Sequence, residues 1–166
     1  MSKPLVGIIM GSDSDLPVLE GTVKTLKEFG IAHEISVLSA HRAPRKVAEY
    51  SATAADRGLK VLIAAAGGAA HLAGAVAANT ILPVIGIPIN ATDLNGLDAL
   101  LATVQMPPGV PVATVAIGKF GAVNAAVLAV QILALGDATL RQKLAQHKQG
   151  MAQKVEDANA KLKPRE

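Results

Sequence analysis

The chain has 166 residues, of which 51% are hydrophobic and 17% charged, and it contains no cysteine. The absence of cysteine excludes disulfides, thiolate metal sites and a cysteine nucleophile. The formal net charge of +3 resides in residues 137–166 and only 2% of the chain is aromatic, so neither a basic surface nor a base-stacking platform for nucleic acid is predicted.

The first part of the chain alternates between strand-like and helix-like segments. Residues 5–10 are a continuous apolar run, which predicts a buried strand. Residues 16–29 follow with apolar side chains at helical spacing, and Pro17 and Gly30 mark the start and the end of this helix. Further strands are predicted over residues 32–38, 60–65, 83–87 and 112–117, and further helices over residues 44–56, 70–79 and 96–104. This alternation indicates an α/β fold with a parallel sheet, right-handed crossovers and helices on both faces.

Two helices follow the last predicted strand. Residues 118–135 are rich in alanine and apolar on nearly every side, so this helix should be buried in the fold or against another subunit. Residues 138–161 are predicted to form a long polar helix. The whole chain, residues 1–166, is therefore predicted to be one domain, with an α/β core over 1–136 and a helical extension over 137–166.

Composition also bears on where the protein works and whether it self-associates. The N-terminal residues do not resemble a signal peptide, and the apolar run at 125–135 is too short to span a bilayer. We therefore expect a cytoplasmic protein without membrane contact. Because charged residues are sparse, part of the surface should be buried by a partner, and self-association is the simplest explanation.

Three polar or glycine-rich loops follow predicted strands, at residues 11–15, 39–44 and 67–71. The carboxyl ends of parallel strands meet at one edge of a sheet, and this edge is where α/β proteins bind their ligands. Three such loops on one edge therefore favour an active site over a set of exposed turns.

The first loop offers groups that suit a sugar phosphate. Gly11 permits a tight turn, and the hydroxyls of Ser12 and Ser14 lie with free amides at a helix N-terminus, where anions bind. Asp15 can accept hydrogen bonds from sugar hydroxyls. The alternative is that Ser14 or Asp15 only caps the helix. The loop lacks the glycine fingerprints of dinucleotide and P-loop sites.

The second loop contains the histidine best suited to proton transfer. His41 lies beside Ser39 and Arg42. An imidazole gives and takes protons near neutral pH, and a guanidinium binds phosphate or carboxylate. A triad of Ser39, His41 and Asp15 is conceivable, but the chain has no Gly-x-Ser-x-Gly nucleophile elbow, so we discount it.

The third loop has side chains so small that its backbone can close over a flat ligand, at Gly67, Gly68 and Ala69. His71, at the end of this loop, either binds a ligand or only starts or packs the next helix. Two histidines without acidic neighbours make a poor metal site, so no metal is predicted. Residues 105–111 contain three prolines and form either a wall of the pocket or a stiff turn.

Seven motifs, in order along residues 5–136, carry a resemblance to a known family. They span residues 11–15, 39–42, 67–72, 95–98, 104–107, 109–112 and 116–126. Together they resemble the N5-carboxyaminoimidazole ribonucleotide mutases of de novo purine biosynthesis. The resemblance implies a flavodoxin-like three-layer αβα sandwich with a five-stranded parallel sheet. It also implies a homo-octamer with active sites between subunits, and a reaction that needs no metal, ATP or organic cofactor.

The resemblance further implies roles for residues of the three loops. His41 would be the general acid and base that helps move a carboxylate from the exocyclic nitrogen of an aminoimidazole ribonucleotide to its ring carbon. Ser12, Asp15 and Arg42 would bind this small-molecule substrate. Additional substrate contacts would come from Ser14, Ser39, Gly67, Gly68, Ala69, His71 and Leu72.

Two other functions remain open. Carboxylases in the same family take aminoimidazole ribonucleotide and free carbon dioxide. The Gly-Gly-Ala-Ala-His-Leu stretch at residues 67–72 resembles the mutase branch, whereas the branch that uses free carbon dioxide differs there. A flavodoxin-like fold can also be a non-catalytic nucleotide-binding module. Such a module would bind a ribonucleotide tightly without isomerising it.

Overall fold

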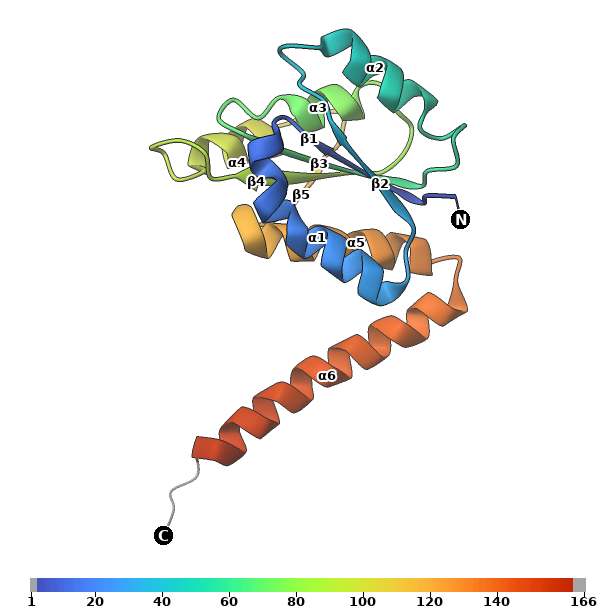
Figure 1. Cartoon of the computed structure of the whole chain (residues 1–166), viewed down its shortest axis with the longest axis vertical. Coiled ribbons are helices and arrows are strands. Elements are labelled where there is room, and N and C mark those ends of the chain that lie inside the picture. The colour runs from blue at the N-terminus through green and yellow to red at the C-terminus, as the bar shows by residue number, and fades with distance from the viewer. Residues whose placement is uncertain (1–2, 163–166) are drawn as a thin grey trace.

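A five-stranded, all-parallel sheet forms the middle layer of the protein (Figure 1). The computed structural model describes residues 3–162. In chain order the strands are β1 (Val6–Met10), β2 (His33–Val37), β3 (Val61–Gly67), β4 (Val84–Ile89) and β5 (Ala113–Thr114). Their order across the sheet is β2-β1-β3-β4-β5. In this arrangement the strand order reverses between β1 and β3, where doubly wound folds bind ligands.

Helices cover both faces of the sheet, so the predicted three-layer sandwich is confirmed. The helices of one face are α1 (Leu16–Phe29) and α5 (Gly118–Ala134), which pack against each other (Figure 1). Those of the other face are α2 (Pro44–Thr53), α3 (Leu72–Ala77) and α4 (Leu97–Val104). A short 3-10 helix, η1 (Asp13–Asp15), which the sequence analysis did not predict, joins β1 to α1.

The sheet separates two apolar cores because successive side chains of a strand point to opposite faces. In β1, Val6, Ile8 and Met10 pack into the core shared with α1 and α5. Ile9 packs into the other core, shared with α2 and α3. Both cores are built mostly from Ala, Val, Ile and Leu, as expected for parallel strands covered on both sides.

Several element boundaries differ from the predicted ones by a few residues, and three of these differences are the most informative. α3 begins at Leu72, because Ala70 has a left-handed φ of 39° that is incompatible with a helix. β5 is an edge strand of two residues, much shorter than the predicted 112–117, and pairs with β4 only at Ile85 and Gly86. β3 runs past its predicted end to Gly67, because Ala66 and Gly67 still pair with β4, which itself extends past its predicted end to Ile89.

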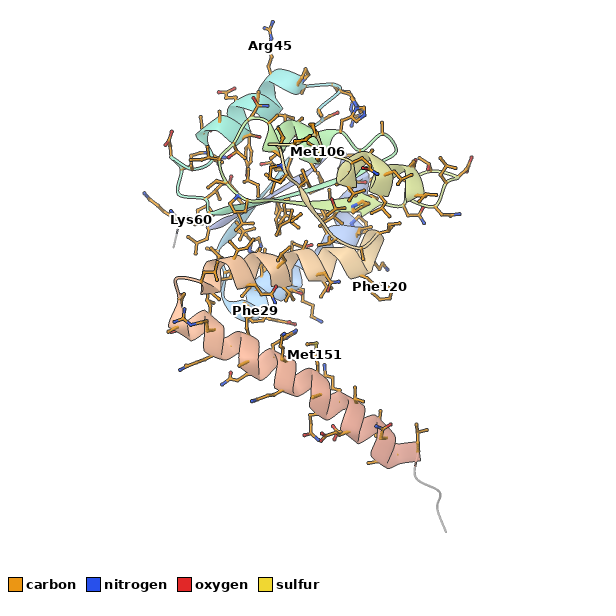
Figure 2. All side chains as sticks on the ribbon, turned by 180° about the vertical axis from the view of Figure 1, so that it is seen from behind. Phe29, Arg45, Lys60, Met106, Phe120 and Met151 are labelled. Atoms are coloured by element: carbon orange, nitrogen blue, oxygen red, sulfur yellow. The ribbon has the colours of Figure 1, made fainter. Side chains whose placement is uncertain are left out.

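The last two helices are only partly buried within one chain. α5 buries one face against the sheet and α1, but Phe120 near its start is 83% exposed (Figure 2). α6 (Ala138–Leu162) runs away from the sandwich (Figure 1), and Leu140 is the one buried residue among those described on it. One chain alone therefore does not bury α5 completely. Among residues 3–162, no helix has the length and apolar character that crossing a membrane requires.

Candidate active site

A cleft of about 360 Å³ opens at the carboxyl ends of β1, β2 and β3, beside the point where the strand order reverses. Its walls are the three loops that the sequence analysis singled out. The lining residues are Gly11, Ser12, Ser14, Asp15, Ser39, Ala40, His41, Arg42, Ala66, Gly67, Ala70, His71, Leu72 and Ala91. Hydroxyl, carboxylate, guanidinium and imidazole groups therefore share one small cavity.

Most of the predicted site residues line this cleft, but some do not. Gly68 and Ala69 are absent from its walls, although they belong to the third loop. Residues 105–111 also lie outside it, and Met106 packs against Gly74 of α3 instead. Two lining residues that the sequence analysis did not name, Ala66 and Ala91, lie outside the three predicted loops, and Gly11, Ala40 and Ala70 lie within them but were not predicted to contact a ligand. An alanine carries no chemical signal in a sequence, so only the folded chain could reveal that these residues shape the cavity.

The first loop is organised by the hydroxyl of Ser12. Its oxygen accepts a hydrogen bond from the backbone N–H of Ser14 at 3.3 Å and another from the Ser14 hydroxyl at 2.9 Å. Ser12 thereby caps η1. Asp15 directly precedes α1, but its side chain makes no capping hydrogen bond. The capping alternative named Ser14 and Asp15, whereas the side chain that caps is that of Ser12, and the Asp15 carboxylate lines the cleft.

Asp15 is a buried acid, with 7% of its surface exposed. Burial raises the pKa of its carboxyl above the ordinary value of 3.8, and the nearby Asp13 carboxylate adds to this effect. Hydrogen bonds from Ser12 and Ser14 oppose the rise in pKa. The free protein therefore keeps Asp15 in a setting that disfavours its charge.

We expect Asp15→Asn to stabilise the free protein at neutral pH. Because folding raises the Asp15 pKa, the ionised carboxylate destabilises the fold above that pKa, and this penalty disappears below the ordinary value of 3.8. Urea unfolding at about pH 7 should give a higher midpoint for the variant than for the wild type. The difference should shrink as the pH falls toward 4. A lower midpoint for the variant at pH 7 would contradict this account.

The second loop is tied to the first by Arg42. Its Nη2 donates to the backbone carbonyl of Gly11 at 2.8 Å, and its Nε donates to the Ser39 hydroxyl at 3.3 Å. The Ser39 hydroxyl also accepts the backbone N–H of Arg42 at 3.2 Å. Nη1 of Arg42 bonds none of residues 3–162, so it is available to a ligand. Ser39 thus accepts two hydrogen bonds from Arg42, whereas His41 Nε2 contacts His71 and not the Ser39 hydroxyl.

The third loop brings a second histidine to the first. His41 Nε2 lies 2.7 Å from His71 Nδ1, and the two rings meet edge to face with centroids 4.8 Å apart. His71 occupies the position before α3, but its side chain makes no capping hydrogen bond. Both imidazoles are exposed in the cleft, so His71 is not a core histidine. Its side chain therefore belongs to the site.

The position of His71 depends on a strained backbone. Ala70 is 2% exposed and has a φ of 39°, which L-residues other than Asn and Asp adopt rarely. Such a conformation costs about 1–3 kcal/mol and persists only where the surrounding packing imposes it. Within the described part of the chain, no group of three or more His, Cys, Asp and Glu side chains could hold a metal ion.

Comparisons with known proteins agree with one another. The family model described as AIR carboxylase matches residues 5–154. An N5-carboxyaminoimidazole ribonucleotide mutase from Pyrococcus horikoshii is 54% identical over 160 residues, which is 96% of this chain and 89% of that protein. A phosphoribosylaminoimidazole carboxylase from Saccharomyces cerevisiae is 54% identical over 146 residues, 88% of this chain but 25% of that protein. The crystal structure of Treponema denticola PurE has a TM-score of 0.84 at 33% identity and covers 97% of this chain and 99% of that one.

Proposed function

This chain belongs to the AIR carboxylase family, and we propose that His41 performs the proton transfers of its reaction in the cleft. The protein is an isomerase of purine biosynthesis, a mutase that converts N5-carboxyaminoimidazole ribonucleotide to 4-carboxy-5-aminoimidazole ribonucleotide. One observation supports the mechanism above all others: a single cavity holds His41 together with Arg42 and both of the other loops. A reacting ring bound to the first loop can therefore reach the imidazole.

We assign the sugar phosphate to the polar side of the cleft. The Arg42 guanidinium, anchored to Gly11 and Ser39, presents a fixed cation for the phosphate. The hydroxyls of Ser12 and Ser14 line the same cleft, and the carboxylate of Asp15 suits the ribose hydroxyls. This assignment leaves the imidazole base of the substrate to lie toward His41 and the small residues of the third loop.

The reaction then needs one imidazole that first gives and later takes a proton. Protonated His41 donates a proton to the exocyclic carbamate nitrogen, and the N–C bond breaks to release carbon dioxide. The electron-rich ring carbon attacks this carbon dioxide and forms the new C–C bond. Neutral His41 removes the proton from that ring carbon, which restores aromaticity and returns His41 to its starting state. Atoms and charge balance without any cofactor.

Two physical effects supply the rate in this scheme. A positioned acid and base contributes roughly 10²–10⁴-fold. Holding carbon dioxide next to the ring carbon makes its recapture effectively intramolecular. The end of β3 and the third loop suit this task, because the small side chains of Ala66 and Ala70 and the absence of one at Gly67 leave room for a flat ring. We therefore assign the retention of carbon dioxide to this side of the cleft.

The second candidate is a carboxylase that uses free carbon dioxide. It is favoured by the yeast relative, which is named a carboxylase and is as similar in sequence as the archaeal mutase. A spectroscopic assay for the carboxylated imidazole product separates the two. We expect product from the N-carboxylated ribonucleotide without added bicarbonate. Product from aminoimidazole ribonucleotide and bicarbonate alone would instead support the carboxylase, and ribonucleotide binding with neither product would support a non-catalytic module.

We also propose that the protein works as a homo-octamer with active sites between subunits, in the cytoplasm. The support is the apolar surface that one chain leaves exposed on β2, α4, α5 and α6. Its residues include Ile35, Val37, Leu97, Leu101, Val104, Phe120, Val123, Met151 and Val155. Sedimentation equilibrium should give eight times the 16.9 kDa mass of the chain. A monomer at the concentrations used in the assay would contradict the octamer.

A further inference from the structure

The contact between the two imidazoles of the cleft has a chemical consequence of its own. A hydrogen bond between His41 Nε2 and His71 Nδ1, 2.7 Å apart, needs one nitrogen with a proton and one with a lone pair. Nδ1 of His41 bonds none of the residues that the structure describes. It is therefore the ring nitrogen of His41 that is available to a substrate.

Only one direction of this hydrogen bond is possible in both protonation states that His41 adopts during the reaction. This conclusion rests on the proposed function, which requires His41 to gain and lose a proton. Protonated His41 carries hydrogens on both nitrogens, so its Nε2 can only donate. If His71 were the donor, the contact would break each time His41 took up a proton. If His71 is a neutral acceptor with its proton on Nε2, the contact persists in both states of His41.

We propose that His71 is a positioning residue that fixes the tautomer and the orientation of His41. Nδ1 of His71 accepts a hydrogen bond from Nε2–H of His41, so that Nδ1 of His41 is the atom that gives and takes the proton. A third group that holds a catalytic histidine in this way is a recurring device of proton-transfer sites. The residue directly before His71 is Ala70, and its left-handed backbone sets the direction in which the chain presents His71 to His41.

Two replacements of His71 separate this role from a merely structural one. His71→Phe keeps a ring of similar size but has no acceptor. His71→Asn places an amide oxygen close to the position of Nδ1 and can still accept the hydrogen bond. The hydrogen-bond partners of metal-binding histidines typically contribute 10- to 100-fold to affinity or activity, and we apply that range to His71. We expect kcat to fall about that much in the Phe variant, with KM nearly unchanged, and most of it to return in the Asn variant.

The tautomer of His41 can be measured by NMR without any substrate turnover. The chain has four histidines, so ¹⁵N-histidine labelling gives few imidazole signals to assign. Neutral His41 should carry its proton on Nε2 in the wild type and in His71→Asn, and should become a mixture of tautomers in His71→Phe. His33→Phe, at the opposite end of β2 from the cleft, is the matched control and should change neither readout.

Each outcome decides for or against the role of His71. Unchanged kcat and an unchanged His41 tautomer in His71→Phe would overturn it. Equal losses in the Phe and Asn variants, with the tautomer preserved in both, would also overturn it and make His71 a substrate contact. If the wild type lacks isomerase activity, the proposed function fails, while the tautomer measurement still tests whether His71 holds His41.

Discussion

His41→Asn should lose turnover while it still binds the ribonucleotide. Asparagine can form hydrogen bonds but does not titrate, so both proton transfers lose their acid and base. We expect kcat to fall by about 10²- to 10⁴-fold, with the dissociation constant of the ribonucleotide changed by only a few fold. Because His41 is exposed and contributes nothing to either core, the variant should fold normally. Product formation and calorimetric binding, measured on the same preparation, check both parts.

A matched control removes an imidazole that lies outside the cleft. The His33 ring contacts the backbone carbonyl of Ile31 through Nδ1 at 2.9 Å, at the amino end of β2. His33→Asn should therefore keep wild-type turnover. Near-normal turnover in His41→Asn would remove this residue from the mechanism. Loss of binding together with turnover would instead make His41 a ligand for the substrate and not its acid and base.

The order of the elements could be predicted from the sequence because each boundary has a local cause. Apolar runs alternate with amphipathic segments, and residues with fixed backbone preferences separate them, as Pro17 and Gly30 do at the ends of α1. The location of the cleft followed from the same order, since parallel strands bring the loops after them to one edge. These inferences need no knowledge of distant contacts.

The contact between His41 and His71 could not be predicted in this way. It depends on the left-handed backbone of Ala70, and alanine gives no sequence signal for such a conformation as glycine would. Which surfaces cover the apolar faces of α5 and α6 could not be predicted from the sequence either. Periodicity shows that a helix face is apolar, but not whether the same chain or another one covers it.

The structure also suggests how the site balances stability against binding. Asp15 is held where its charge is disfavoured, and Ala70 is held in a strained conformation. Both features cost stability in the free protein, and both serve the cleft. Backbone strain clusters at functional sites, where the surrounding structure imposes it, and so do groups with perturbed pKa values. The two apolar cores on either side of the sheet are the source of that stability here.

Arg42→Met should weaken substrate binding more than any other single change in the cleft that leaves His41 in place. Among residues 3–162, Arg42 is the one arginine that lines the cavity, and its guanidinium also joins the first two loops through Gly11 and Ser39. A charge-assisted hydrogen bond contributes about 1.5–3 kcal/mol, and 1.4 kcal/mol is tenfold in affinity. We therefore expect KM to rise roughly 100-fold, measured by initial rates of product formation.

Two further variants distinguish charge from geometry at this position. Arg42→Lys keeps the positive charge but cannot contact Gly11, Ser39 and a phosphate at once, so its KM should lie between those of the wild type and Arg42→Met. Arg45→Met removes the same group from α2, where the side chain points away from the body of the protein (Figure 2), and should leave KM unchanged. If Arg42→Lys behaved as the wild type, a point charge would be sufficient. If Arg42→Met did so, the phosphate would have to bind elsewhere in the cleft.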